Sequence, residues 1–175
     1  MKWKGKLINY IIEQLKDDTK WGNTIEKMLV DSSIGIHLAV FNEPFLSLVF
    51  KGEKKIESRF SMNKISPYGK IKKGDIVILK ESGGYVTGLF VAGEVKSFHK
   101  LSKAVMNQIE LEYGKLICAV YDKDFWRNRD RTNYATLIEV KKIKKLPAFR
   151  SEKRDRSGWS VLRDGSISNL FVDKG

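Results

Sequence analysis

Helical and strand spacings of apolar residues alternate along the chain. Residues 5–16 carry apolar side chains at helical intervals, which predicts an amphipathic helix, and a second short helical pattern follows Gly22. The apolar run of residues 34–41 is typical of a buried strand. Residues 45–49 and 102–113 again show the helical period. The pattern therefore predicts helices interleaved with strands.

Further strands are predicted in the second part of the chain, over residues 75–80, 85–95, 134–140, 159–162 and 167–172. Gly83 and Gly84 lie between the first two of these and predict a two-residue hairpin turn. A short helix or turn carrying Phe125 and Trp126 is expected over residues 124–129. Five or six strands with interspersed helices predict an α+β barrel.

Capping signals indicate where the helices begin and end. Asn42 is expected to cap a short helix that has Pro44 in its first turn, and Ser102 is expected to cap a later one. Gly52 is expected to end the first of these helices in a left-handed conformation. Lys54 then lies at a helix-to-strand junction, from which its side chain is expected to project into a cleft.

The strand that begins at Lys55 has two chemically different faces, because its polar and apolar residues alternate. One face carries Ile56, Ser58 and Phe60, and the other carries Lys55, Glu57, Arg59 and Ser61. An acid, a guanidinium and a hydroxyl on one face suit the binding of a planar polar group from several directions. A solvated edge strand gives the same pattern, so the pattern alone leaves both interpretations open.

A resemblance to a known family rests on this stretch. Gly52, Lys54, Glu57 and Arg59 match the G-x-K-x-x-E-x-R signature of the ASCH superfamily, which has a PUA-like β-barrel fold. Other segments resemble the longer bacterial ASCH-domain proteins, namely residues 37–40, 43–46, 74–77, 80–84, 125–126, 134–138 and 153–159. The resemblance spans residues 34–165 and implies a barrel of five to six mostly antiparallel strands with flanking helices.

The extent of this resemblance divides the chain into two parts. Residues 34–175 are expected to form the ASCH, PUA-like barrel domain, and residues 1–33 an N-terminal helical extension outside the resemblance. We expect the extension to cover part of the barrel, and a dimerisation element and a lid are the alternatives.

The chain is strongly basic, with 33 Lys and Arg against 21 Asp and Glu and a formal net charge of +12. Such an excess favours phosphate-rich partners through counterion release and long-range steering. The densest cluster lies between Lys141 and Arg156, where eight basic residues accompany two acids. This segment is the strongest candidate in the chain for electrostatic contact with a nucleic acid.

Several classes of protein are excluded by composition. No apolar run of about 18 residues exists, so no membrane-spanning helix is expected. Cys118 is the only cysteine, which excludes an intrachain disulfide and a thiolate zinc cluster and predicts a cytoplasmic protein. His37 and His99 lack a second ligand at metal-binding spacing, and no phosphate-binding P-loop is present. We therefore expect no metal and no cofactor.

The predicted function is binding of RNA or a modified nucleotide in a basic barrel cleft. The residues predicted to bind are Lys54, Lys55, Glu57, Arg59, Ser61, Lys80, Trp126, Lys153, Arg154, Arg156 and Trp159. Aromatic rings flanked by cations are how proteins hold single-stranded or flipped nucleotides, and residues 153–159 would form a second wall of the cleft. Core packing of the two tryptophans and a solvated loop for the two arginines, Arg154 and Arg156, are the alternatives.

Catalysis in the same cleft is the second hypothesis. The superfamily is proposed to act in RNA metabolism; one branch contains 4-acetylcytidine amidohydrolases that use a lysine, a threonine and a glutamate, and other members are reported as ribonucleases. Lys54 matches the lysine, but Glu57 stands where that branch has its threonine, and Ser61 lies two steps further along the strand. Glu110 or Glu112 would be the glutamate.

A metal-independent hydrolase would then use Lys54 as a base, with Glu57 to orient it or to shuttle protons. A third hypothesis is a module that works through protein contacts made by the N-terminal helices.

Overall fold

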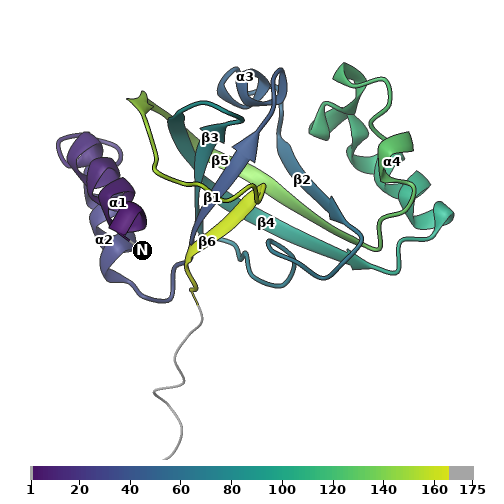
Figure 1. Ribbon diagram of the computed structural model, residues 1–175, viewed down its shortest axis with the longest axis horizontal. Helices are drawn as coiled ribbons and strands as arrows, with labels where there is room; N and C mark the ends of the chain where they lie inside the picture. The colour runs from purple at the N-terminus through teal and green to yellow at the C-terminus, as the bar shows by residue number, and fades with distance from the viewer. Residues whose placement is uncertain (1, 166–175) are drawn as a thin grey trace, which may run out of the picture.

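The computed structural model describes residues 2–165, which form a six-stranded mixed sheet with the strand order β2-β5-β4-β3-β1-β6. The strands are β1 (Ile36–Phe41), β2 (Ile56–Ser61), β3 (Ile76–Glu81), β4 (Val86–His99), β5 (Tyr134–Phe149) and β6 (Trp159–Arg163). β1 and β3 are parallel, and the other neighbouring pairs are antiparallel. The sheet curls into a half-barrel (Figure 1), so the chain is an α+β protein, as expected.

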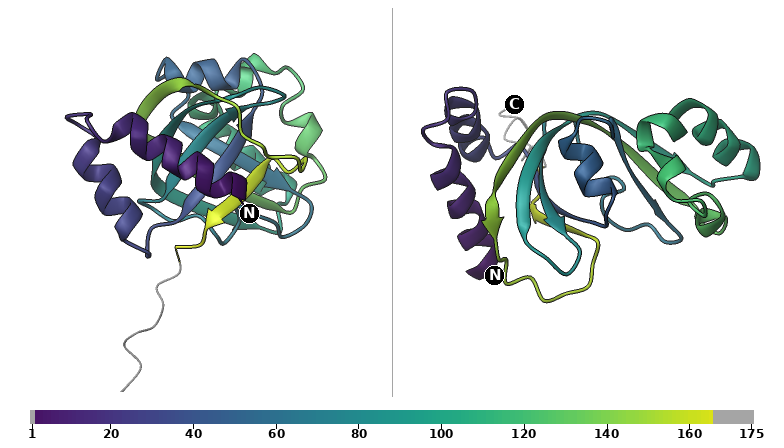
Figure 2. Two further views of the ribbon diagram at one scale, coloured as in Figure 1. Left: turned by 60° about the vertical axis from the view of Figure 1, so that its left-hand side comes forward. Right: turned by 90° about the horizontal axis from the view of Figure 1, so that it is seen from above.

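Helices cover both faces of the curled sheet. They are α1 (Lys2–Leu15), α2 (Gly22–Val30), α3 (Phe45–Phe50) and α4 (Lys103–Ile117), with the short 3₁₀ turns η1 (Ala119–Tyr121) and η2 (Arg127–Arg129). Seen from above, α3 lies inside the curl, α1 and α2 lie against its outer face, and α4 lies at the far end (Figure 2).

Both faces of the central strands are buried, which explains why their sequences read as continuous apolar runs. Ile36 and Leu38 of β1 point outward into a core that α1, α2 and the turn between them complete with Leu7, Ile11, Leu15, Trp21 and Ile25. Ala39 and Phe41 of the same strand point inward and pack with Leu46 and Val49 of α3. The N-terminal helices therefore share a core with the barrel sheet.

The elements predicted within residues 2–165 are present, and three details of the prediction are wrong. Asn42 does not cap α3 with its side chain: Pro44 occupies the N-cap position, and the Asn42 carbonyl accepts the N–H groups of Phe45 and Leu46. The turn at Gly83 and Gly84 is longer than two residues, because β3 ends at Glu81 and β4 begins at Val86.

The third difference concerns β5, which extends to Phe149 instead of ending at Val140. Lys144 and Lys145 pair with Leu89 and Gly88 of β4, so half of the basic cluster belongs to a strand. The strand expected over residues 167–172 lies outside the described residues. No helix within residues 2–165 is long and apolar enough to cross a membrane.

Candidate functional site

A tight turn after α3 sets the position of Lys54. Gly52 has a φ of +72°, a left-handed conformation that glycine adopts without strain, and this confirms the predicted end of the helix. The next two backbone N–H groups, of Glu53 and Lys54, both donate to the Leu48 carbonyl, at 3.0 and 3.1 Å. Lys54 is thereby fixed at the entrance to β2, with its side chain directed into the protein.

Lys54, Glu57 and Arg59 form a cluster of charges inside the barrel. Lys54 Nζ donates to the Ile117 carbonyl at 2.8 Å and lies 3.3 Å from Glu57 Oε2. Arg59 Nε donates to Glu57 Oε1 at 2.6 Å. The side chains of Lys54 and Glu57 are only 3% and 6% exposed, so one carboxylate compensates the charge of two neighbouring cations.

Arg59 also joins the two edges of the curled sheet. Its strand, β2, lies at one end of the strand order, and β1 and β6 lie at the other. Nη2 donates to the Val40 carbonyl of β1 at 2.8 Å, and Nη1 donates to the Gly158 carbonyl just before β6 at 3.1 Å. The guanidinium lies 5.2 and 5.3 Å from the ring centroids of Phe41 and Trp159. These contacts close the seam of the half-barrel, by which we mean the junction between β2 and the β1–β6 edge.

A guanidinium carries five N–H donors. Glu57, Val40 and Gly158 engage three of those on Arg59, and the other two have no acceptor within residues 2–165. Arg59 is therefore a structural bridge with hydrogen-bonding capacity left for a ligand.

Trp159 connects this cluster to a buried histidine. Its indole Nε1 donates to His37 Nδ1 at 3.1 Å, and His37 Nε2 lies 3.0 Å from Asp75 Oδ2. Asp75 also accepts the backbone N–H groups of Gly35 and Lys72, at 2.7 and 2.8 Å. Burial alone would raise the pKa of Asp75, but the hydrogen bonds from His37 and the two backbone groups lower it below its ordinary value.

The charged cluster lines a pocket of about 450 Å³ between β2, the end of β1 and the η2 turn. Its walls comprise Val40, Phe41, Asn42, Phe45, Lys54, Glu57, Ser58, Arg59, Phe60, Asp122, Phe125, Asn128, Arg129 and Thr132. We call this the barrel pocket. Its ionisable side chains are three cations and two carboxylates, which leaves an excess of positive charge among aromatic rings and neutral polar groups.

Arg129 of the η2 turn completes the barrel pocket. Its guanidinium lies 3.5 Å from the centre of the Phe125 ring, and Nη1 donates to the Phe125 carbonyl at 2.6 Å. Its other N–H donors have no acceptor within residues 2–165. Arg129 is absent from the residues predicted from sequence, although a mixed aromatic and basic run such as Phe125–Arg129 is a signal for such a residue.

Burial changes the acid–base properties of the pocket's cations. It lowers the pKa of Lys54, and Arg59 lowers it further, whereas Glu57 opposes the change. Burial likewise lowers the pKa of Arg129, against the opposing charges of Asp122 and Glu57. The protein therefore holds these cations in an environment where an anionic ligand would relieve their mutual repulsion.

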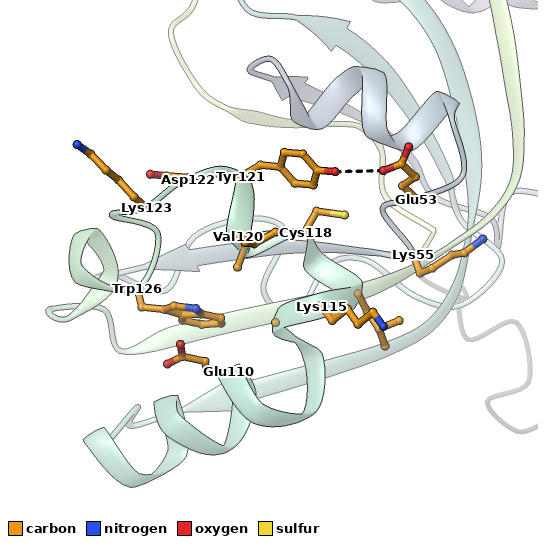
Figure 3. A pocket seen from close by; sticks show the side chains of 13 residues that line it. Glu53, Lys55, Glu110, Lys115, Cys118, Val120, Tyr121, Asp122, Lys123 and Trp126 are labelled. Carbon is orange, nitrogen blue, oxygen red and sulfur yellow. Dashed lines mark hydrogen bonds between the residues drawn. The ribbon is translucent and has the colours of Figure 1, made fainter.

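Lys55 and Trp126 line a different and larger pocket of about 900 Å³, on the outer side of α4 and η1 (Figure 3). Trp126 also packs edge-on against Phe60 and Phe125. Glu110 lies beside Trp126 in this outer pocket, where the figure also shows Cys118. Glu112 is exposed and accepts from Gln108 at 3.0 Å, so neither glutamate of α4 lines the barrel pocket.

The other predicted residues lie outside the barrel pocket. Lys153 is held within its own loop, because Nζ donates to the carbonyls of Asp155 and Ser157, and Arg154 and Arg156 are exposed. Lys80 Nζ donates to the Glu81 carbonyl, and burial lowers its pKa with the help of neighbouring Lys153. Ser61 ends β2 opposite Tyr134.

Trp159 is the only member of residues 153–159 that touches the charged cluster through its side chain in the part of the chain that the structure describes. Nowhere in residues 2–165 do three or more His, Cys, Asp or Glu side chains gather closely enough to hold a metal ion.

Comparisons with known proteins agree with this architecture. The family model of the ASCH domain matches residues 40–159. The structure is similar to that of ASCH from Zymomonas mobilis, with a TM-score of 0.57 and 12% identity over 73% of this chain and 87% of that chain. A substitution mutant of the same Zymomonas mobilis protein gives a TM-score of 0.57 and 13% identity over 77% and 92%.

At these identities the structural likeness concerns the fold. Among curated proteins no match is found. The family model spans more than half of the chain and includes every residue that lines the barrel pocket. The chain therefore belongs to the ASCH domain family.

Proposed function

We propose that this ASCH domain binds RNA, or a single modified nucleotide, in the barrel pocket. The observation that carries the proposal is the pair of guanidinium groups, Arg59 and Arg129, that line one pocket and keep unengaged N–H donors after their contacts within residues 2–165. Guanidinium groups are suited to phosphate oxygens and to the acceptor edges of bases. The rings of Phe45, Phe60 and Phe125 in the same walls supply apolar and stacking surface for a base.

The charged and neutral residues of the pocket have different roles in this proposal. Glu57 is already paired with Lys54 and Arg59, so its first task is to hold those two cations. Asn42, Asn128 and Thr132 offer the neutral donors and acceptors that base recognition needs. We assign anion binding mainly to Arg129 and orientation of the ligand to Arg59.

Arg129→Met should weaken binding of a fluorescein-labelled hexaribonucleotide by about tenfold to a hundredfold. A hydrogen bond to a charged group contributes about 1.5–3 kcal/mol, and methionine keeps an unbranched apolar side chain beside Phe125 without the charge. Fluorescence anisotropy at a fixed salt concentration measures the change.

Arg127→Met is the matched control, because Arg127 lies two positions away, is 76% exposed and pairs with Asp124 outside the pocket. An equal loss of affinity in the two variants would mean that only the overall charge matters. Unchanged affinity in Arg129→Met would remove the barrel pocket as the binding site.

Hydrolysis of the bound ligand is a second candidate function, favoured by one observation: burial lowers the pKa of Lys54, which lines the pocket. A lysine that loses its proton more readily is better suited to act as a general base toward water. Glu110 and Glu112 do not line the pocket, so Asp122 is its second carboxylate beside Glu57.

If the pocket is catalytic, wild type should convert 4-acetylcytidine to cytidine and acetate, or cleave the hexaribonucleotide, in the presence of a chelator. Lys54→Met should abolish the product, and Lys55→Met should retain it because Lys55 lies outside the pocket. Mass spectrometry of the products measures both reactions. Recovery of intact ligands from wild type would refute the catalytic function and leave binding untouched.

A further inference from the structure

Hydrogen bonds link Asp75 to His37 and His37 to Trp159, and the Trp159 ring contacts the guanidinium of Arg59. We infer that His37 is a positioning residue: through the Trp159 hydrogen bond it fixes the plane of Arg59, and thereby the strength of ligand binding, without lining the pocket. The consequence for affinity rests on the proposed function, whereas the effect on Arg59 does not.

The tautomer of His37 follows from its two partners. An indole N–H is a donor only, so Nδ1 of His37 must accept from Trp159 and carries no proton. The ring proton then resides on Nε2, which donates to the Asp75 carboxylate. All three side chains are almost fully buried, at 0%, 2% and 6% exposure for His37, Asp75 and Trp159. The arrangement therefore has one hydrogen-bonding pattern.

The backbone at Gly35 packs closely against the side chains of Asp75 and His37 and restricts their positions. A Cβ atom at Gly35 would come within 2.7 Å of Asp75 Oδ2 and 2.9 Å of His37 Nε2. Asp75 is itself held by the N–H groups of Gly35 and Lys72. The histidine ring is thus fixed at one end, and its Nδ1 fixes the indole at the other.

The indole in turn sets the plane of Arg59. The guanidinium lies close to the rings of both Phe41 and Trp159, and its Nη1 donates to the carbonyl of Gly158, the residue before Trp159. A rotation of the indole would displace the ring surface beside the guanidinium, whereas the Gly158 carbonyl is held separately by the Val40 N–H at 2.9 Å. The orientation of the two unengaged N–H groups of Arg59 would then no longer be fixed.

Three substitutions separate positioning from simple support of the fold. His37→Asn keeps an acceptor near Nδ1 for the indole but loses the bond to Asp75. His37→Gln keeps a donor near Nε2 for Asp75 but loses the acceptor for the indole. Trp159→Phe keeps an aromatic surface under Arg59 but removes the N–H donor.

The first readout needs no ligand. Exchange of the Arg59 Nε–H with solvent is followed by NMR on protein labelled with ¹⁵N-arginine, since this proton is bonded to Glu57. Loss of the Trp159 hydrogen bond should speed the exchange roughly fivefold in His37→Gln and in Trp159→Phe, as expected for one hydrogen bond. His37→Asn should exchange within about twofold of wild type.

The second readout is the affinity for the hexaribonucleotide, which should weaken roughly fivefold in His37→Gln and in Trp159→Phe but not in His37→Asn. The double variant His37→Gln, Trp159→Phe should be no weaker than either single variant, because both remove the same bond.

A purely supporting role of His37 predicts the opposite order. His37→Asn, which loses the Asp75 bond, would then be the most perturbed variant, and Trp159→Phe would leave Arg59 unchanged. That order, or additive effects in the double variant, would overturn the inference. Absence of RNA binding by wild type would refute the proposed function, and the exchange of Arg59 Nε–H would still decide the positioning role.

Discussion

Glu57→Ala is expected to lower the free energy of unfolding by about 3–5 kcal/mol, the range for breaking a buried ion pair by removal of one partner. Glu57 is the carboxylate that contacts both Lys54 and Arg59, and the Lys54 side chain is only 3% exposed. Without Glu57, the Lys54 ammonium would retain the Ile117 carbonyl but no opposite charge in contact among the described residues. Urea unfolding at neutral pH measures the loss.

The pH dependence of this loss has a defined sign. Burial lowers the pKa of Lys54, and removal of Glu57 takes away the charge that opposes the shift. The folded variant then binds fewer protons than the unfolded chain, so its stability rises as pH increases toward the unfolded lysine pKa of about 10.4. The deficit relative to wild type should therefore shrink at high pH.

Glu53→Ala is the matched control. Glu53 lies four residues earlier and is exposed, and within residues 2–165 its carboxylate accepts only from Tyr121, at 3.3 Å. Its replacement should change stability by no more than about 0.5 kcal/mol. If the two alanine variants were equally stable, the charged cluster would not be buried as described.

Removal of residues 2–33 is expected to abolish cooperative folding of the barrel. Burial of a large apolar side chain contributes roughly 1.5–3 kcal/mol, and α1 and the segment through α2 bury Leu7, Ile11, Leu15, Trp21 and Ile25 against the sheet. Their combined contribution is comparable with the whole stability of a typical domain, about 5–15 kcal/mol. The truncated chain would also expose the outer faces of β1 and β3.

Thermal unfolding and size-exclusion chromatography of the truncated chain measure this effect. Leu7→Ala and Leu111→Ala in the full chain give a finer comparison, since Leu7 is 0% and Leu111 is 86% exposed. The first should cost about 2–5 kcal/mol and the second less than about 0.5 kcal/mol. A soluble, cooperatively folding chain without residues 2–33 would contradict the prediction and make the extension a separable unit.

The expected unfolding on deletion of residues 2–33 changes how the hypothesis of protein contacts by the N-terminal helices must be tested. Loss of all activity on deletion would have supported that hypothesis if the helices were an independent appendage. Because they share a core with β1 and β3, deletion would remove activity by unfolding. Substitutions on the exposed face of α1, such as Lys2 and Lys6, are the appropriate test.

Most of the fold could be predicted from the sequence because the spacing of apolar residues shows which face of each helix or strand is buried. The alternating strand 55–61 and the apolar run 34–41 correspond to β2 and β1. Ser102 caps α4 and accepts from the Val105 N–H at 3.2 Å, as expected from its side chain. The extension of β5 was missed because Lys141–Lys145 lacks an apolar face of its own, and pairing with β4 decides its conformation.

The site was predictable only in part, for a related reason. Lys54, Glu57 and Arg59 lie close together along the chain, so one strand brings them together. Arg129 enters the pocket from a turn seventy residues later, and spacing along the chain carries no information on such a meeting. The same holds for His37 and Asp75, which meet because β1 and β3 are parallel neighbours.

The closure of the seam by Arg59 changes what the family signature can report. Even without a ligand, this chain would still use Arg59, held by Glu57, to join β2 to the opposite edge of its sheet. The arginine of the G-x-K-x-x-E-x-R motif thus has a structural role in this chain that does not depend on what the pocket binds. Arg129, Asn128 and Thr132 line the same pocket from outside the seam, so substitutions there should change ligand binding without opening the half-barrel.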